Sequence, residues 1–100
     1  MKLENLILLN TLSNYYQIEM TFFSNLRELS LIEIQTINEL QYIQEDDLYK
    51  IEKMIRMHQD LNINIEGIDV VFNLLQKINT LKSELVSVKN RLHLYEANLT

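Results

Sequence analysis

Apolar residues recur at alternating steps of three and four positions over the last third of the chain. The members of this series, which we call the seam, are Val71, Leu74, Ile78, Leu81, Leu85, Val88, Leu92 and Tyr95. These steps give a 3.5-residue period, which is the spacing at which the helices of a coiled coil meet. The pattern predicts a helix whose apolar stripe is roughly 37 Å long at 1.5 Å per residue. We expect the same helix of a second copy to cover this stripe, so that the protein is a homodimer.

Two short helical patterns stand near the start of the chain. Asn10 or Thr11 is expected to cap a first helix that ends near Tyr16, and residues 17–19 form a tight connection to a second helix over residues 20–29. The side chains expected to face the core are Leu12, Tyr15, Phe22 or Phe23, Leu26 and Leu29. Two short helices joined by about three residues are typical of a helix-turn-helix.

The next stretch alternates apolar and polar residues, as a half-buried strand does. The alternating positions are Ile32, Ile34 and Thr36, and then Leu40 and Tyr42. Asn38 and Glu39 lie between the two runs and are expected to form the turn. The pattern predicts a small β-hairpin, or wing, that packs on the helices because a lone hairpin is marginally stable.

A third and a fourth helix are expected to follow the hairpin. Residues 45–47 are acidic and complement the positive end of the third helix. Its apolar stripe is Leu48, Ile51, Ile55, His58 and Leu61, flanked by Met54 and Met57. Asn64 is expected to cap the fourth helix, which carries Ile65, Ile68, Val71, Phe72 and Leu75 and continues into the seam, either unbroken or with a bend near Asn79.

These elements predict a mostly α-helical protein with two parts. Residues 1–62 form a winged helix-turn-helix head with a small β-hairpin and the third helix. Residues 63–100 form the fourth helix and a long C-terminal dimerisation helix of the coiled-coil type.

The net charge of −5 is unevenly distributed. Residues 1–44 contribute −3 and residues 45–60 contribute −2, while basic and acidic residues balance over 61–100. The expected second helix offers only Asn25 and Arg27 to bases and phosphates, and the wing has no lysine or arginine. An acidic head repels a phosphate backbone and attracts a basic protein surface, so direct DNA binding is not expected.

The composition argues against an enzyme and against a cofactor or metal site. The chain has no cysteine, a single glycine and no catalytic or phosphate-binding motif. His58 is expected to be a partly buried structural residue and His93 a solvated one. Glu45, Asp46 and Asp47 lack the spaced oxygen ligands of a calcium loop, so we expect a helix-capping role. The apolar run near the N-terminus is too short for a secretory signal and no stretch is long enough to span a membrane, so a cytoplasmic location is expected.

Several stretches carry a resemblance to a known family. They are Leu29–Glu33, Tyr42–Leu48, Ile51–Arg56, Leu61–Asp69, Lys89–Leu92 and Leu94–Glu96. In this order the chain resembles the MerR-like winged-helix proteins, and in particular the chaperone-modulator CbpM family in its Bacteroidetes form. One departure is Ser30, where relatives often have glycine.

The resemblance implies a partner and a function. Proteins of that family bind the J-domain of a CbpA-type DnaJ-like co-chaperone and inhibit its co-chaperone and DNA-binding activities. Such a protein would reach the nucleoid only through its partner. We expect an acidic partner-binding face formed by Glu33, Glu39, Glu45, Asp46 and Asp47, with Tyr16 or Tyr49 as an exposed aromatic anchor.

Two other functions stay open on the sequence alone. The chain could be a MerR-like DNA-binding transcription regulator, or a bare dimerisation module that acts on another regulator.

Overall fold

The computed structural model describes residues 5–99, and the side chains of residues 5–98. The chain divides into two compact units, a head that ends at Asp69 and a stalk that begins at Val70. Residues 63–69 therefore belong to the head by their contacts. The sequence suggested a boundary after residue 62, which is seven residues earlier.

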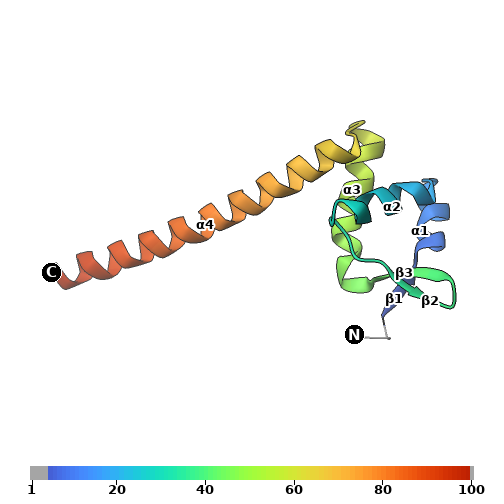
Figure 1. Cartoon of the computed structure of the whole chain (residues 1–100). Coiled ribbons are helices and arrows are strands. Elements are labelled where there is room, and N and C mark those ends of the chain that lie inside the picture. Colours follow the sequence, from blue (N-terminus) through green and yellow to red (C-terminus); the bar gives the residue numbers. More distant parts are fainter. Residues whose placement is uncertain (1–4, 100) are drawn as a thin grey trace. The chain divides into compact units, whose positions relative to one another are not determined.

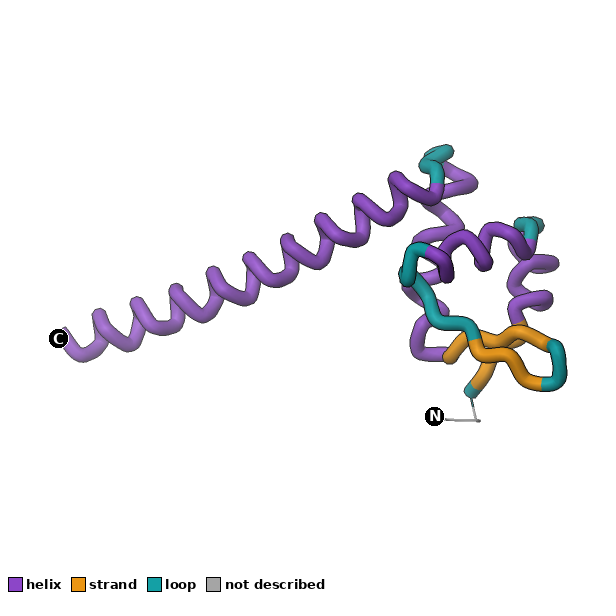
Figure 2. The backbone as a smooth tube through the Cα atoms, in the orientation of Figure 1, coloured by secondary structure: helices purple, strands orange, loops and turns teal. Residues whose placement is uncertain are grey.

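Within residues 5–69 the head comprises three short α-helices, one 3₁₀ helix, three short strands and the start of α4 (Figures 1 and 2). Its elements are β1 (Leu6–Leu8), α1 (Leu9–Tyr16), α2 (Met20–Glu28), β2 (Gln35–Ile37), β3 (Leu40–Gln44), the 3₁₀ helix η1 (Glu45–Asp47) and α3 (Leu48–Asp60). This order confirms the predicted winged helix-turn-helix. Each helix is short, so its stability depends on packing its apolar face against the others.

The strands form an antiparallel sheet in the order β1-β3-β2. Leu8 pairs with Tyr42, and Thr36 pairs with Gln41. The turn between β2 and β3 consists of Asn38 and Glu39, both with positive φ, as in the two-residue turns that match the twist of a hairpin. The predicted wing and its turn are thus confirmed. β1 was not predicted, because three residues are too few to show an alternating pattern.

Among the residues that the structure describes, thirteen buried apolar side chains form the core of the head. They are Leu9, Leu12, Ile18, Phe22, Phe23, Leu26, Leu31, Ile32, Ile43, Ile51, Met54, Ile55 and Ile68. Both phenylalanines are buried, with their rings edge to face at 5.6 Å between centroids. Met54 was expected to flank the apolar stripe of α3, but its side chain is fully buried in the core.

Three residues that were expected to face the core are exposed instead. Tyr15 is 77% exposed because the inward face of α1 runs through Leu9, Leu12 and Tyr16. Leu29 (39% exposed) and Leu61 (68% exposed) lie just beyond the last helical residues of α2 and α3. The helical period no longer applies at those positions, so the predictions for all three were wrong.

Helix α2 ends in a left-handed turn at Ser30, whose φ is 58°. The Leu31 N–H donates to the Leu26 carbonyl at 3.0 Å, and the Ser30 N–H donates to the Arg27 carbonyl at 2.9 Å. These two hydrogen bonds form a Schellman motif, and Leu26 and Leu31, at the positions whose side chains often pack together in this motif, are both buried. Glycine is the residue most often found at this position because it has no Cβ to strain.

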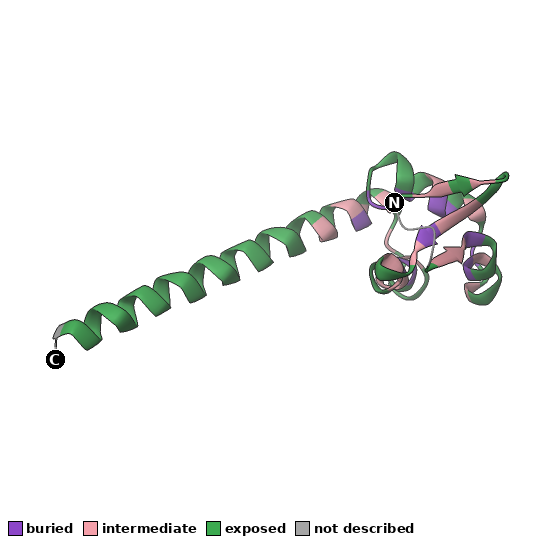
Figure 3. Cartoon of the chain, turned by 90° about the horizontal axis from the view of Figure 1, so that it is seen from below, coloured by how far each residue is buried: buried purple, intermediate pink, exposed green. Residues whose placement is uncertain are grey.

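Helix α4 spans Ile65–Leu99 as one element, so the alternative with a break near Asn79 does not apply. The Gly67 N–H donates to the Asn64 Oδ1 at 2.8 Å, which confirms Asn64 as the N-cap. A Cβ at Gly67 would lie 2.7 Å from the Ile63 Cγ2, so this capped turn leaves no room for a side chain. Beyond Phe72 the described residues of α4 are all exposed (Figure 3).

Replacing Ser30 by glycine should stabilise the head. Removing the Cβ relieves a left-handed strain of roughly 1–2 kcal/mol, against an entropy loss of about 0.5–1 kcal/mol. We expect Ser30→Gly to raise the free energy of unfolding by about 0.5–1 kcal/mol in denaturant titrations. Ser30→Ala, which keeps the Cβ, is the matched control and should give no gain.

Candidate interaction surfaces

The DNA-facing elements of a winged helix-turn-helix are the second helix and the wing, and here they carry little positive charge. The exposed residues of α2 are Thr21, Asn25, Arg27 and Glu28. Arg27 is the only cation within residues 20–44, and Glu39 adds a negative charge at the hairpin turn. Since each phosphate contact needs a donor or a cation, this surface can neutralise few phosphates.

Four of the five acids that were expected to bind a partner come from neighbouring parts of the head. Glu33, in the loop before β2, and Asp47, at the end of η1, line the same surface depression. Glu45 and Asp46 precede Asp47 directly and are both exposed. We call Glu33, Glu45, Asp46 and Asp47 the acidic corner.

Glu39 is separate from the acidic corner. It lies at the hairpin turn, six residues before Glu45 along the extended strand β3, a distance of about 20 Å at 3.3 Å per residue. A partner would have to span the whole length of β3 to contact both.

The carboxylates of the acidic corner have no hydrogen-bond or ion-pair partner among residues 5–99. Lys50 shares the depression with Glu33 and Asp47 but forms no ion pair within the described part of the chain. Residues three positions apart in a helix lie close together, so the spacing of Asp47 and Lys50 could have predicted from the sequence that Lys50 lies beside the acidic corner. The corner therefore presents several negative charges that no neighbour neutralises at contact distance.

The two aromatic anchors proposed from the sequence differ in exposure. Tyr16 is half-buried, and its hydroxyl donates to the Glu52 carboxylate of α3. Its carbonyl also accepts from the Gln59 side-chain amide at 2.8 Å, so Tyr16 joins α1 to α3 and is not an exposed anchor. The exposed ring of that pair is Tyr15, which meets Tyr16 edge to face at 4.8 Å. Tyr49 is 66% exposed as expected, and the Lys53 Nζ lies 4.5 Å from its ring centroid.

His58 has the structural role that the sequence predicted. It is half-buried, its Nδ1 lies 3.1 Å from the Ile63 carbonyl oxygen, and its ring packs on Phe22 at 5.0 Å. Since a carbonyl oxygen only accepts, Nδ1 carries the proton of this hydrogen bond. Among residues 5–99 no three His, Cys, Asp or Glu side chains gather as metal ligands would, and no helix has the length and apolar character of a membrane span.

The seam is exposed along the stalk. From Leu74 to Tyr95 its seven members are between 45% and 64% exposed, and Val71 is half-buried. Fully burying one such side chain is worth about 1.5–3 kcal/mol, so the stripe provides a large driving force for association. A few apolar residues, such as Val86 and Leu94, are exposed off the seam but form no second stripe.

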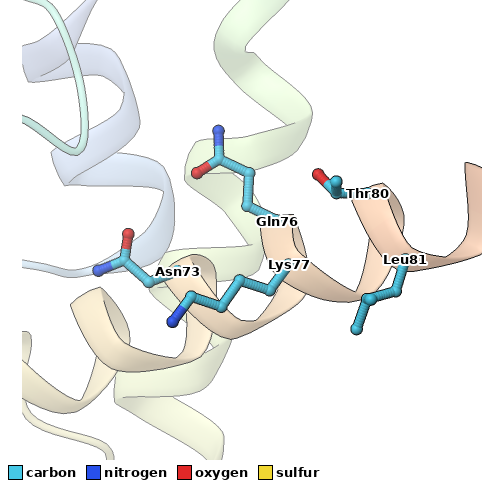
Figure 4. Close-up of a pocket in the computed structure, with 5 residues that line it drawn as sticks. All are labelled: Asn73, Gln76, Lys77, Thr80 and Leu81. Carbon is cyan, nitrogen blue, oxygen red and sulfur yellow. The ribbon is translucent and has the colours of Figure 1, made fainter. Parts of the chain in front are cut away.

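One hollow lies on the stalk itself (Figure 4). Its lining residues are Asn73, Gln76, Lys77, Thr80 and Leu81, all from α4. Because a single helix supplies every wall, the hollow does not enclose a ligand. Its members are mostly polar and adjoin the seam at Leu81.

A comparison with protein families gives one match. The family described as "MerR HTH family regulatory protein" matches residues 7–90, which include the helix-turn-helix, the wing and most of the stalk. No curated protein and no solved structure is significantly similar to the chain.

A charge in the middle of the seam should abolish self-association. Leu85→Asp would place a carboxylate where an apolar contact is expected. Desolvating the carboxylate costs several kcal/mol, roughly the free energy gained by burying two seam side chains. We expect sedimentation at several concentrations to show a dimer for the parent chain and a monomer for Leu85→Asp. Ser83→Asp introduces the same charge off the seam and should remain dimeric.

Proposed function

This chain belongs to the MerR helix-turn-helix family of regulatory proteins, and we propose that it is a non-enzymatic chaperone modulator of the CbpM type. In this proposal a homodimer binds the J-domain of a CbpA-type DnaJ-like co-chaperone through the acidic corner. Binding blocks the surface through which the J-domain stimulates its Hsp70 partner and also restrains the DNA binding of the co-chaperone. The resemblance of the middle third of the chain to that family supplies the identity of the partner.

The observation that carries the proposal is the scarcity of positive charge on the helix-turn-helix and wing of this MerR-family head. Arg27 is the only cation of α2 and the wing, whereas the acidic corner has four unpaired carboxylates within the described part of the chain. Complementary charge accelerates encounter with a basic surface and disfavours encounter with a polyanion. A basic J-domain surface is a suitable partner for such a head.

An exposed aromatic ring next to the acidic corner adds a second type of contact. Tyr49 follows Asp47 by two residues and is largely exposed. Aromatic residues often provide a large share of binding energy at interfaces, whereas exposed charges contribute mainly to rate and orientation. We propose that Tyr49 anchors the J-domain and that the carboxylates orient it.

A DNA-binding transcription regulator is the second candidate. The family match favours it, and Asn25 and Arg27 are exposed on α2, as a base-reading helix requires. Such a regulator would need other cations for its phosphate contacts, so we rank it second.

Charge reversal at the acidic corner should weaken J-domain binding. The variant Glu33→Lys, Glu45→Lys, Asp46→Lys leaves the half-buried Asp47 in place and changes the charge by +6. We expect the Kd for a purified CbpA-type J-domain, measured by fluorescence anisotropy, to rise roughly 10- to 100-fold, at about 0.5–0.9 kcal/mol per reversed residue. Affinity of the parent chain should fall as salt is raised from 50 to 300 mM.

The matched control is Glu28→Lys, Asp60→Lys, Glu66→Lys, which makes the same charge change at exposed acids outside the corner. It should change the Kd by less than about threefold, because it alters the long-range charge but no contact. Equal losses in both triple variants would refute the assigned face. Nanomolar binding of an operator duplex at physiological salt, with no J-domain affinity, would instead establish the regulator.

A further inference from the structure

The three-stranded sheet of the head carries apolar residues on both of its sides. Successive residues of a strand point to opposite sides, and residues paired across two antiparallel strands point to the same side. Ile43 is fully buried, so the side with Ile43 and its partner Ile7 packs against the helices. The opposite side, which we call the outer face, consists of Leu6, Leu8, Gln35, Ile37, Leu40, Tyr42 and Gln44.

The outer face is accessible to a partner. None of its seven residues is buried, and Leu40 is 42% exposed. Figure 1 shows α1, α2 and α3 above the strands. An exposed side of an antiparallel sheet usually carries polar residues, whereas this one is apolar except for Gln35 and Gln44. A contiguous apolar surface of this kind is typical of an interaction site.

The charges that border the outer face are negative. The strands β1, β2 and β3 contain no charged residue, and no lysine or arginine occurs between Arg27 and Lys50. Glu39 lies in the turn at one end of β3, and Glu45 and Asp46 follow its other end. All three acids are exposed. A partner that covers the apolar centre and pairs with these acids therefore needs a cation near each of its own ends.

The dimensions of the outer face match a single helix. The outer strands β1 and β2 are separated by two intervals of about 4.8 Å, which together give about 10 Å, the diameter of an α-helix. The separation of about 20 Å between Glu39 and Glu45 along β3 corresponds to about thirteen helical residues. An added strand fits less well, because the edge strands β1 and β2 have only three residues each.

We propose that the outer face binds a basic amphipathic helix of a partner protein. The apolar stripe of this helix packs on Leu40 and Tyr42. Its cations, about thirteen residues apart, meet Glu39 at one end and Glu45 and Asp46 at the other. The inference rests on the proposed function in one respect, the use of Glu45 and Asp46, and it adds Glu39 and the apolar outer face to the same site.

Binding of a designed peptide to the whole chain tests the proposal. The probe is a fluorescein-labelled peptide of about eighteen residues, with leucines at helical spacing and lysines near both ends. The control peptide has the same composition, with the leucines shuffled so that no apolar stripe forms. We expect the probe to bind roughly tenfold more tightly than the shuffled peptide in fluorescence anisotropy, because only the probe covers the outer face. Equal affinity for the two peptides overturns the proposal.

A matched pair of variants locates the binding surface. Ile37 and Leu40 are paired on the outer face, and Thr36 and Gln41 are paired on the opposite side of the same strands. Ile37→Thr with Leu40→Thr should raise the Kd for the probe roughly tenfold, because it removes apolar area while keeping residues that suit a strand. Thr36→Ser with Gln41→Thr should leave the Kd unchanged. Equal effects of the two double variants, with circular dichroism showing both folded, contradict the proposal.

The acids at the ends of β3 are tested by charge removal. Glu39→Gln should raise the Kd for the probe roughly two- to fourfold, whereas Glu28→Gln, at an exposed acid outside the site, should not change it. In a probe without the lysines at one end or the other, one of the two shortened peptides should no longer respond to Glu39→Gln. No response to Glu39→Gln with the complete probe refutes the contact assigned to this acid.

Two further measurements separate this proposal from its alternatives. If the probe does not bind but a J-domain still binds through the acidic corner, only the helix-binding outer face is refuted. If the probe binds and a J-domain does not, the proposed function fails and the outer face remains a helix-binding surface. A change in self-association of Ile37→Thr with Leu40→Thr, measured by sedimentation, would assign the outer face to a second copy of the chain and overturn the proposal.

Discussion

The exposed apolar stripe of the stalk is the constraint on which the rest of this protein depends. A helix gains most of its stability in proteins from burying an apolar face, yet the seam of α4 has no cover within the described part of a single chain. The lone chain is therefore an incomplete unit. Any function proposed for the head therefore has to be considered together with this uncovered stripe on the stalk.

The local chemistry of the sequence predicted much of the fold. The helix-turn-helix, the turn at Asn38 and Glu39, and the Asn64 cap each depend on contacts between near neighbours, which a sequence pattern records directly. The errors occurred at the ends of elements: Leu29 and Leu61 lie just past helix ends, α1 begins at Leu9 and so includes the expected caps Asn10 and Thr11, and β1 is too short to show a period. Tyr15 and Tyr16 are adjacent, and the inward face of α1 that carries Leu9 and Leu12 continues to Tyr16, whose hydroxyl donates to the Glu52 carboxylate.

The candidate surfaces were predictable to different degrees. The seam follows from periodicity alone, whereas the acidic face requires knowledge of which loops meet. Glu33 and Asp47 are fourteen positions apart and line one depression, a proximity that depends on the hairpin returning the chain to the start of α3. Glu39 is nearer to Glu33 in sequence, but it lies in the turn that precedes β3, whereas Glu45 follows the other end of that strand. The length of β3 therefore separates Glu39 from the acidic corner.

Helix α4 belongs to both compact units. Ile68 is fully buried in the head, and Val71, the first seam residue, follows it one turn later on the same face of the helix. Unravelling the start of α4 would therefore disturb the head core and the seam at once. By mass action, the proposed association of the stalks should protect the head against unfolding, so the thermal midpoint of the whole molecule would rise with its own concentration.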